Sequence, residues 1–254
     1  MSWLLYGIVF AGPRRGSDPP PMLPSGVGGA PVRLIAANGL GAAVSSVDSS
    51  EITPSVGRAL AYAKVVEALH ADLTVLPLRY GCVLGQESDV VELLRTQSGT
   101  YAERLRGLDG CVEMGIRVPT VPQGSAGMGD CGVKGAGWRG DVSGPFSGTA
   151  YLDRQKEFYA ERERRAHEAA ASVQRHCASL AGLFLRCKTE HCAAQGPRSL
   201  FDVPFLSVHF LVKREGLPSF RAAVLRIDFT ERARFLLSGP WPPYNFAVPD
   251  LQNE

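Results

Sequence analysis

The chain lacks any apolar stretch long enough to cross a membrane, and it lacks an excess of charge of one sign. A spanning helix needs about 20 predominantly apolar residues, and no run in this sequence approaches that length. Basic residues number 27 and acidic residues 25, for a net charge of +2. This balance favours neither nucleic acid nor an anionic membrane as a partner. The apolar run from Trp3 to Gly12 is not preceded by the basic residues of a secretory signal, so we expect a cytoplasmic protein.

Recognisable catalytic motifs are also missing. The sequence contains no G-x-S-x-G, no P-loop and no H-E-x-x-H. Two G-x-G-x-x-G matches, at residues 127–132 and 135–140, follow no strand and open no helix, as a dinucleotide site would require. The five histidines lack a paired carboxylate or a nucleophile motif. We therefore assign no catalytic residue and no cofactor, and we predict that the protein is not an enzyme.

The sequence does not favour a metal site either. A structural zinc site usually shows ligands paired two to four residues apart on a turn. The candidate ligands are His176-Cys177, Cys187 and His191-Cys192, and Cys177 and Cys187 lie at the helical spacing of apolar residues. Cys177 and Cys187 are better explained as thiols packed on the apolar face of a helix. We assign no metal ion.

What the sequence does contain is enough apolar material for a core, because 45% of its residues are hydrophobic. Residues 3–10 are apolar and aromatic, which predicts a strand buried on both faces. Alternating runs then flank Asn38-Gly39, the strongest short-range signal for a β-hairpin. Thr53-Pro54 predicts the start of an amphipathic helix.

The next elements complete a first domain over residues 1–118. Pro77 interrupts the strand-like residues 74–84, which indicates an edge strand or a bulge. Helical segments follow from Glu87. Residues 112–118 then alternate between apolar and other residues, which predicts a half-buried strand. The order β-ββ-α-β-αα-β predicts an α+β domain with an antiparallel sheet in a modified ferredoxin-like arrangement.

A stretch rich in glycine and proline at residues 119–148 predicts a linker. The second domain, residues 149–254, is predicted to be α+β. It begins with a long helix from Tyr151 to Cys187, for which Gly182 is an alternative, earlier end. It continues with a strand at 206–212, a helix from Gly216 and a strand at 233–237.

The last strand leads into an unusually stiff segment, Gly239 to Phe246. Its prolines fix the backbone and cannot donate hydrogen bonds, so it is not helical. It could pack across the second domain or present its aromatic side chains to a partner, and its position directly after a strand favours packing. The three aromatic residues of the segment are Trp241, Tyr244 and Phe246.

One alternative function follows from the fold. Ferredoxin-like domains include RNA-binding modules that stack bases on aromatic side chains of two central strands. Tyr6 in Leu5–Val9 and Tyr80 in Arg79–Val83 faintly resemble those strand motifs. An RNA-binding module is therefore the alternative, although the second segment has Cys82 where an aromatic residue is needed.

Taken in order, several segments resemble the gas vesicle protein L/F family, GvpL/GvpF. The resemblance covers nearly the whole chain, and its two most specific segments are Pro-Leu-Arg-Tyr-Gly and Gly-Pro-Trp-Pro-Pro-Tyr. Where the family usually has Glu-Trp-Gly, this chain has Glu113-Met114-Gly115. The candidate residues of the family motifs, for packing or partner contact, are Tyr6, Pro77, Arg79, Tyr80, Gly239, Pro240, Trp241, Pro242, Pro243, Tyr244 and Phe246.

The resemblance implies a non-enzymatic accessory protein of gas vesicles, the gas-filled protein shells that give cells buoyancy. It implies a role in nucleation or assembly of the shell. The expected partners are the small hydrophobic shell protein, of the GvpA type, and other accessory proteins, with neither nucleic acid nor a membrane among them. The expected location is the gas vesicle, in the cytoplasm.

Overall fold

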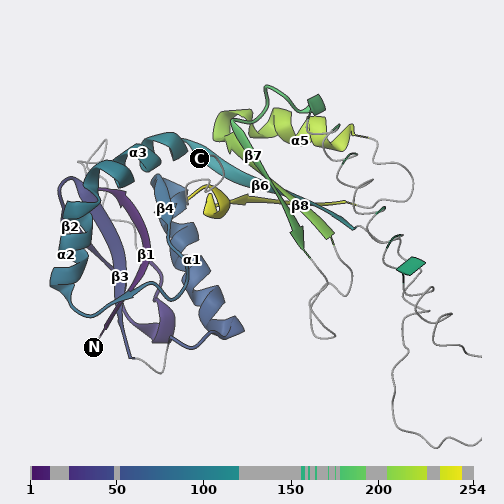
Figure 1. Cartoon of the computed structure of the whole chain (residues 1–254). Coiled ribbons are helices and arrows are strands. Elements are labelled where there is room, and N and C mark those ends of the chain that lie inside the picture. Colours follow the sequence, from purple (N-terminus) through teal and green to yellow (C-terminus); the bar gives the residue numbers. More distant parts are fainter. Residues whose placement is uncertain are drawn as a thin grey trace, which may run out of the picture.

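The protein is built from two antiparallel sheets and the helices that cover them (Figure 1). The predicted α+β class is confirmed, with four α-helices in the described part of the chain. The predicted linker beyond residue 119, both glycine-rich matches and most of the predicted long helix lie outside the described residues. A computed structural model describes residues 2–11, 23–48, 52–119, 178–192, 205–227 and 235–247, with the helical residues 156, 157, 160, 164, 171 and 175.

The first sheet has the strand order β2-β3-β1-β4, with β5 beside β1 on the same edge as β4. All of its pairs are antiparallel, as predicted. The predicted hairpin is confirmed, because Asn38 and Gly39 have φ angles of 49° and 74°. These left-handed values suit the tight turn that Asn-Gly favours. The strands are β1 (Ser2–Phe10), β2 (Arg33–Ala37), β3 (Leu40–Val47), β4 (Val75–Pro77) and β5 (Val83–Leu84).

Helices cover both faces of this sheet, so β1 is buried on both sides as its composition predicts. Helix α1 packs on one face through Tyr62, Val66 and Leu69, whereas α2 and α3 cover the other. Helix α1 begins later than predicted, because Ser55 rather than Thr53 caps it by accepting the Arg58 backbone N–H. The helices are α1 (Val56–Asp72), α2 (Glu87–Thr96) and α3 (Ser98–Leu108), and the short 3₁₀ turn η1 is Val27–Gly29.

The second sheet has the order β7-β8-β6-β9 and is also antiparallel. Helix α5 packs over one face, where Phe220 and Val224 meet Phe210 of β8 (Figure 1). Its elements are β6 (Cys111–Pro119), β7 (Arg186–Cys192), β8 (Phe205–Lys213), η4 (Arg214–Gly216), α5 (Leu217–Leu225), β9 (Leu236–Trp241) and η5 (Tyr244–Phe246).

The strand predicted at residues 112–118 belongs to this second sheet, which corrects its predicted place in the first. It pairs with β8 and β9 along its length, after a turn in which Gly110 has a φ of 64°. The alternating pattern predicts a strand, but pairing depends on residues far away in the sequence. The division of the chain into domains stays a prediction.

The helix predicted from Tyr151 ends before Cys187, near Gly182, which is the earlier end that the sequence also offers. Gly182 adopts a left-handed φ of 85°, a conformation that ends helices. Residues from Arg186 then form strand β7 at the edge of the second sheet. Cys187 is consequently exposed rather than packed on a helix face.

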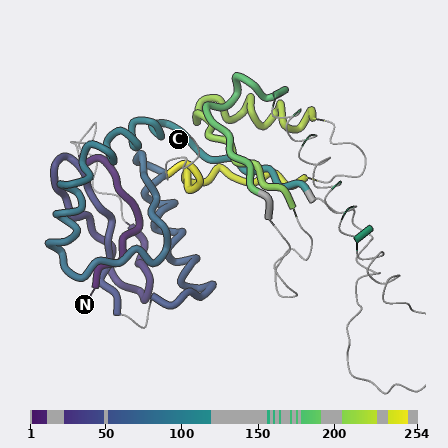
Figure 2. The backbone as a smooth tube through the Cα atoms, in the orientation of Figure 1, coloured from purple at the N-terminus to yellow at the C-terminus, as the bar shows by residue number. Residues whose placement is uncertain are grey.

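Glu113 of β6 is buried, although its place on the polar face of a half-buried strand predicts exposure. Only 4% of its surface is exposed. Oε2 accepts the backbone N–H of Asn245 at 2.9 Å, and Oε1 accepts the side-chain amide of Asn245. The polar face of the strand is covered because the C-terminal segment crosses it between the two sheets (Figure 2).

A second connection between the sheets involves His70 near the end of α1. Arg214, at the end of β8, donates a hydrogen bond from its guanidinium to the His70 carbonyl oxygen. The imidazole is buried, and neither ring nitrogen has a hydrogen-bonding partner within the described residues. Burial, assisted by the positive charge of Arg214, lowers the pKa of His70 from 6.5 to about 4.

We expect Glu113→Gln to destabilise the protein by about 1–3 kcal/mol, because one amide nitrogen would then face the donors of Asn245. Denaturant unfolding measures the loss. Glu190→Gln is the matched control, since Glu190 is exposed on β7 and should change stability by less than about 0.5 kcal/mol. Equal stability of the two variants would contradict a stabilising role for the hydrogen bonds between Glu113 and Asn245.

We expect acidification from pH 6.5 toward pH 4 to lower the free energy of unfolding more in the native protein than in His70→Leu. The difference between the two proteins should grow by roughly 1 kcal/mol per pH unit. A depressed pKa means that the folded state holds neutral His70, so its contribution is complete above pH 6.5 and is lost on acidification. Unfolding curves at several pH values measure the difference. Parallel pH dependence of the two proteins would refute this role for the imidazole.

Candidate functional site

Tyr6, one of the predicted motif residues, lies on β1, and its side chain is fully buried between the first sheet and α1. Its hydroxyl accepts the backbone N–H of Val27 at 2.9 Å and shares a hydrogen bond with Ser45. Its ring stacks on Tyr62 with a centroid separation of 4.8 Å, and burial raises the pKa of Tyr6. Tyr6 therefore has a structural role in the core. It does not offer the exposed ring that the RNA-binding alternative needs.

The other residues of the first motif follow strand β4. Pro77 ends β4, which lies at an edge of the first sheet as the proline predicts. Pro77 is buried, whereas Arg79 is exposed. Tyr80 is half-buried and lies edge-on to Tyr62 at 5.4 Å. Pro77, Arg79 and Tyr80 are brought together at one end of the first sheet.

Tyr62 is the residue that links this cluster, and the sequence shows it only as one apolar position of helix α1. Its hydroxyl lies 2.9–3.1 Å from the carbonyl oxygens of Leu5, Tyr6 and Leu78. Burial is the main cause that raises the pKa of Tyr62, so the phenol stays protonated. The hydroxyl fixes the irregular residues after β4 against β1.

The segment from Gly239 begins inside strand β9, which reaches Trp241. Gly239 has a φ of 108°, and a Cβ there would lie 2.6 Å from the Glu113 carbonyl oxygen. Only glycine fits this close approach without strain. Pro240 is exposed, and Pro242 and Pro243 are buried. The strand and its close contact bring the family segment against β6.

The aromatic residues of this segment point in different directions. Trp241 is 43% exposed and Tyr244 is 36% exposed, but Phe246 is buried. Phe246 packs in the core of the first sheet, together with Leu211 from the second. Arg186 and Lys188 of β7 lie over its ring at 5.3 and 5.6 Å. The segment thus joins the two sheets instead of only covering the second domain.

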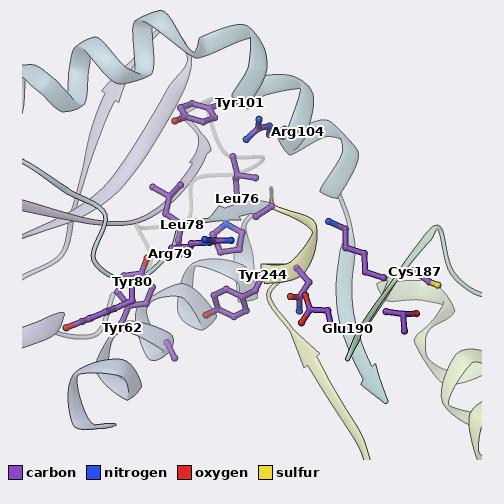
Figure 3. Close-up of a pocket in the computed structure, with 16 residues that line it drawn as sticks. Tyr62, Leu76, Leu78, Arg79, Tyr80, Tyr101, Arg104, Cys187, Glu190 and Tyr244 are labelled. Carbon is purple, nitrogen blue, oxygen red and sulfur yellow. Dashed lines mark hydrogen bonds between the residues drawn. The ribbon is translucent and has the colours of Figure 1, made fainter. Parts of the chain in front are cut away.

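A cleft of about 1020 Å³ lies where these segments meet, and we call it the inter-sheet cleft. Figure 3 shows Tyr101 and Arg104 on α3, Tyr62 and Tyr80 in the first half of the chain, and Cys187 and Glu190 across from them on β7. Its lining residues are Tyr62, Ala63, Leu76, Pro77, Leu78, Arg79, Tyr80, Tyr101, Arg104, Cys187, Lys188, Thr189, Glu190, Tyr244, Asn245 and Ala247.

The inter-sheet cleft combines positive charge with neutral phenol groups. Arg79, Arg104 and Lys188 line it, against the single carboxylate of Glu190. Burial, followed by the charges of Glu67 and Glu113, raises the pKa of Tyr244 to about 12. This tyrosine therefore offers a neutral hydrogen-bonding hydroxyl near neutral pH.

A smaller cavity of about 170 Å³ lies beside Glu113 and His209. His209 Nδ1 is 3.0 Å from Glu113 Oε1 and 2.9 Å from the Asn245 side-chain nitrogen. Ser207 and Ser238 also line the cavity, but within the described residues neither hydroxyl bonds to the imidazole. Both carboxylate oxygens already bind Asn245. The arrangement ties the C-terminal segment to the sheet.

Two searches of the described residues were negative. No helix there has the length and apolar character to span a membrane. Within the same residues, no group of three or more His, Cys, Asp or Glu side chains is arranged to hold a metal ion.

We expect Tyr62→Phe to destabilise the protein by about 1–2 kcal/mol, because the hydroxyl would no longer bond to the buried carbonyl oxygens around it. Tyr101→Phe is the matched control, since Tyr101 lines the same cleft but is only half-buried. Thermal and denaturant unfolding compare the two. A larger loss for the control would contradict the role of Tyr62.

Comparison with known proteins places this arrangement in a family. The chain is 28% identical to gas vesicle protein F of Streptomyces sp. (strain CB03234), over 97% of this chain and 99% of that protein. It is 27% identical to gas vesicle protein L of the same strain, over 87% and 85%.

The fold is that of solved GvpF structures. The GvpF crystal structure from Anabaena sp. PCC7120 matches all of this chain and 98% of that one, with a TM-score of 0.71 and 20% identity. GvpF from Microcystis aeruginosa matches 98% and 99%, with a TM-score of 0.67 and 19% identity. The family described as gas vesicle synthesis protein GvpL/GvpF matches residues 2–248. The chain belongs to the GvpL/GvpF family of gas vesicle proteins.

Proposed function

We propose that this gas vesicle accessory protein acts by protein–protein contact during vesicle assembly or nucleation. Its partners are the hydrophobic shell protein, of the GvpA type, and other gas vesicle accessory proteins. The contact takes place at the gas vesicle in the cytoplasm. Membership of a family described as gas vesicle synthesis proteins supports this role, and the proposed contact requires no catalytic step.

The observation that carries the proposal is the apolar outer edge of β9. This strand is the last in the order of the second sheet and pairs with β6. Leu236 is 50% exposed and Trp241 is 43% exposed, with the exposed Pro240 between them. Soluble proteins usually protect edge strands with charge or cover them, so exposed apolar side chains along an edge favour contact with another protein.

Trp241 suits such a contact because its position is already fixed. Residues on both sides of it are anchored: Arg221 donates a hydrogen bond to the Gly239 carbonyl oxygen at 3.1 Å, and Asn245 is bound to Glu113. A tryptophan that is held in place loses little conformational entropy on binding, and tryptophan is enriched at the energetic centres of interfaces.

A partner with a large apolar surface is the natural occupant of this edge. A free shell subunit exposes apolar surface that would otherwise drive aggregation. Covering part of that surface with the β9 edge restrains aggregation until the subunit joins the growing shell. This step requires no covalent chemistry.

The test is co-purification of the shell protein from cells that express both proteins. We expect the double variant Trp241→Ala, Leu236→Ala to retain about a tenth or less of the shell protein bound by the native protein. Its melting temperature should fall less than that of a variant in the buried core, because about half of each side chain is exposed. Leu60→Ala is the matched control, since Leu60 is exposed on α1 at 57%.

Two outcomes would count against the proposal. One is no association of the native protein with the shell protein, with or without the other accessory proteins. The other is equal capture by the double variant and by the Leu60 control.

A further inference from the structure

We infer that the inter-sheet cleft is a second binding site, which accepts an extended acidic segment of a protein partner. This inference goes beyond the apolar contact proposed for the β9 edge. Trp241 and Leu236 do not line the cleft, so the two surfaces can be tested separately.

The position of the cleft favours an extended segment. Strand β4 ends the order of the first sheet and β7 ends that of the second, and residues of both strands line the cleft. Edge strands bind extended peptides by adding them to the sheet, with pockets beside the edge selecting side chains. The C-terminal residues Tyr244, Asn245 and Ala247 form part of the wall between these strands.

The charges of the cleft favour carboxylates. Its three cationic side chains come from three separate elements: Arg79 from the residues after β4, Arg104 from α3 and Lys188 from β7. Glu190 is the one acidic residue in the lining. Side chains of one sign gathered in a concave site attract a ligand of the opposite sign.

The two arginines are also available for such a ligand. Within the described residues, neither Arg79 nor Arg104 forms an ion pair, whereas Arg33 pairs with Glu87 on the other side of the first sheet. An arginine guanidinium binds a carboxylate through two parallel hydrogen bonds. A partner segment with acidic side chains would supply the missing acceptors.

The aromatic and apolar residues that line the cleft suit the side chains that would lie between the acidic residues of the partner segment. Tyr101, Tyr244 and Leu78 are partly exposed in the cleft, and together with Tyr80 they offer apolar surface with polar tips. Such walls bury aliphatic or aromatic side chains and orient them by hydrogen bonds. Acidic residues alternating with apolar ones therefore match the cleft best.

A nucleic acid would also bring negative charge, but the lining favours it less. The chain as a whole carries only +2, and nucleic-acid sites usually lie in a strongly basic surface. Tyr6 is fully buried and Tyr62 is nearly so, so neither presents a face for stacking bases.

The experiment measures binding of a labelled peptide of about ten residues, with glutamate alternating with leucine, tyrosine or serine. The comparison probes are the same peptide with glutamine in place of glutamate, and a single-stranded uridine oligonucleotide. We expect the acidic peptide to bind the full chain, with weaker binding of the glutamine peptide and of the oligonucleotide. Its affinity should fall as salt is raised.

Charge reversal locates the site. We expect Arg79→Glu and Arg104→Glu each to weaken binding of the acidic peptide by about fivefold or more. Arg106→Glu is the matched control, because Arg106 is exposed on the same helix as Arg104 but does not line the cleft. If a reversal disturbs the circular dichroism spectrum, Arg79→Gln and Arg104→Gln replace it, with a smaller loss expected in the same direction.

Three results would overturn the inference: equal binding of the acidic and glutamine peptides, preference for the oligonucleotide, or unchanged affinity in both arginine variants. These outcomes are independent of the proposed shell contact. The double variant Trp241→Ala, Leu236→Ala should bind the acidic peptide normally. Shell-protein capture without peptide binding would reject only the cleft, and peptide binding without shell-protein capture would reject only the β9 contact.

Discussion

The buried carboxylate of Glu113 is the constraint on which the arrangement of this protein depends. A charged group removed from water is tolerated only when hydrogen bonds replace its hydration. The donors here come from Asn245, through both its backbone N–H and its side-chain amide. These two hydrogen bonds hold the C-terminal segment against the second sheet. That position inserts Phe246 into the core of the first sheet and leaves Trp241 exposed at the β9 edge.

This one fixed segment therefore forms parts of two different surfaces. Tyr244 faces the inter-sheet cleft with Arg79 and Tyr80, which lie far away in the sequence. Trp241 is 43% exposed on β9 and also lines the smaller cavity beside Glu113. The two most specific sequence segments of the family thus meet in space, and a protein that assembles others can use separate surfaces for separate partners. The sequence leaves packing and partner contact as alternatives for this segment. In the structure Phe246 packs in the core, whereas Trp241 is partly exposed and available for contact.

Local interactions explain what could be predicted from the sequence. The Asn38-Gly39 hairpin depends on the left-handed preferences of two adjacent residues, and the edge position of β4 depends on one proline. The sheet to which β6 belongs and the burial of Glu113 could not be predicted, because both depend on residues nearly a hundred positions or more away. The motif residues were identified one by one, but Arg104 and Lys188 carry no local signal, so the cleft itself could not be anticipated.

We propose that Trp241 contacts the shell protein during vesicle assembly. The most direct measurement places a photo-crosslinking amino acid at position 241, or at position 60 on α1 as a control, in cells that are forming gas vesicles. The account predicts a covalent adduct with the shell protein from position 241 and none from position 60. Adducts of equal yield from both positions, or none from position 241 while vesicles form normally, would contradict it.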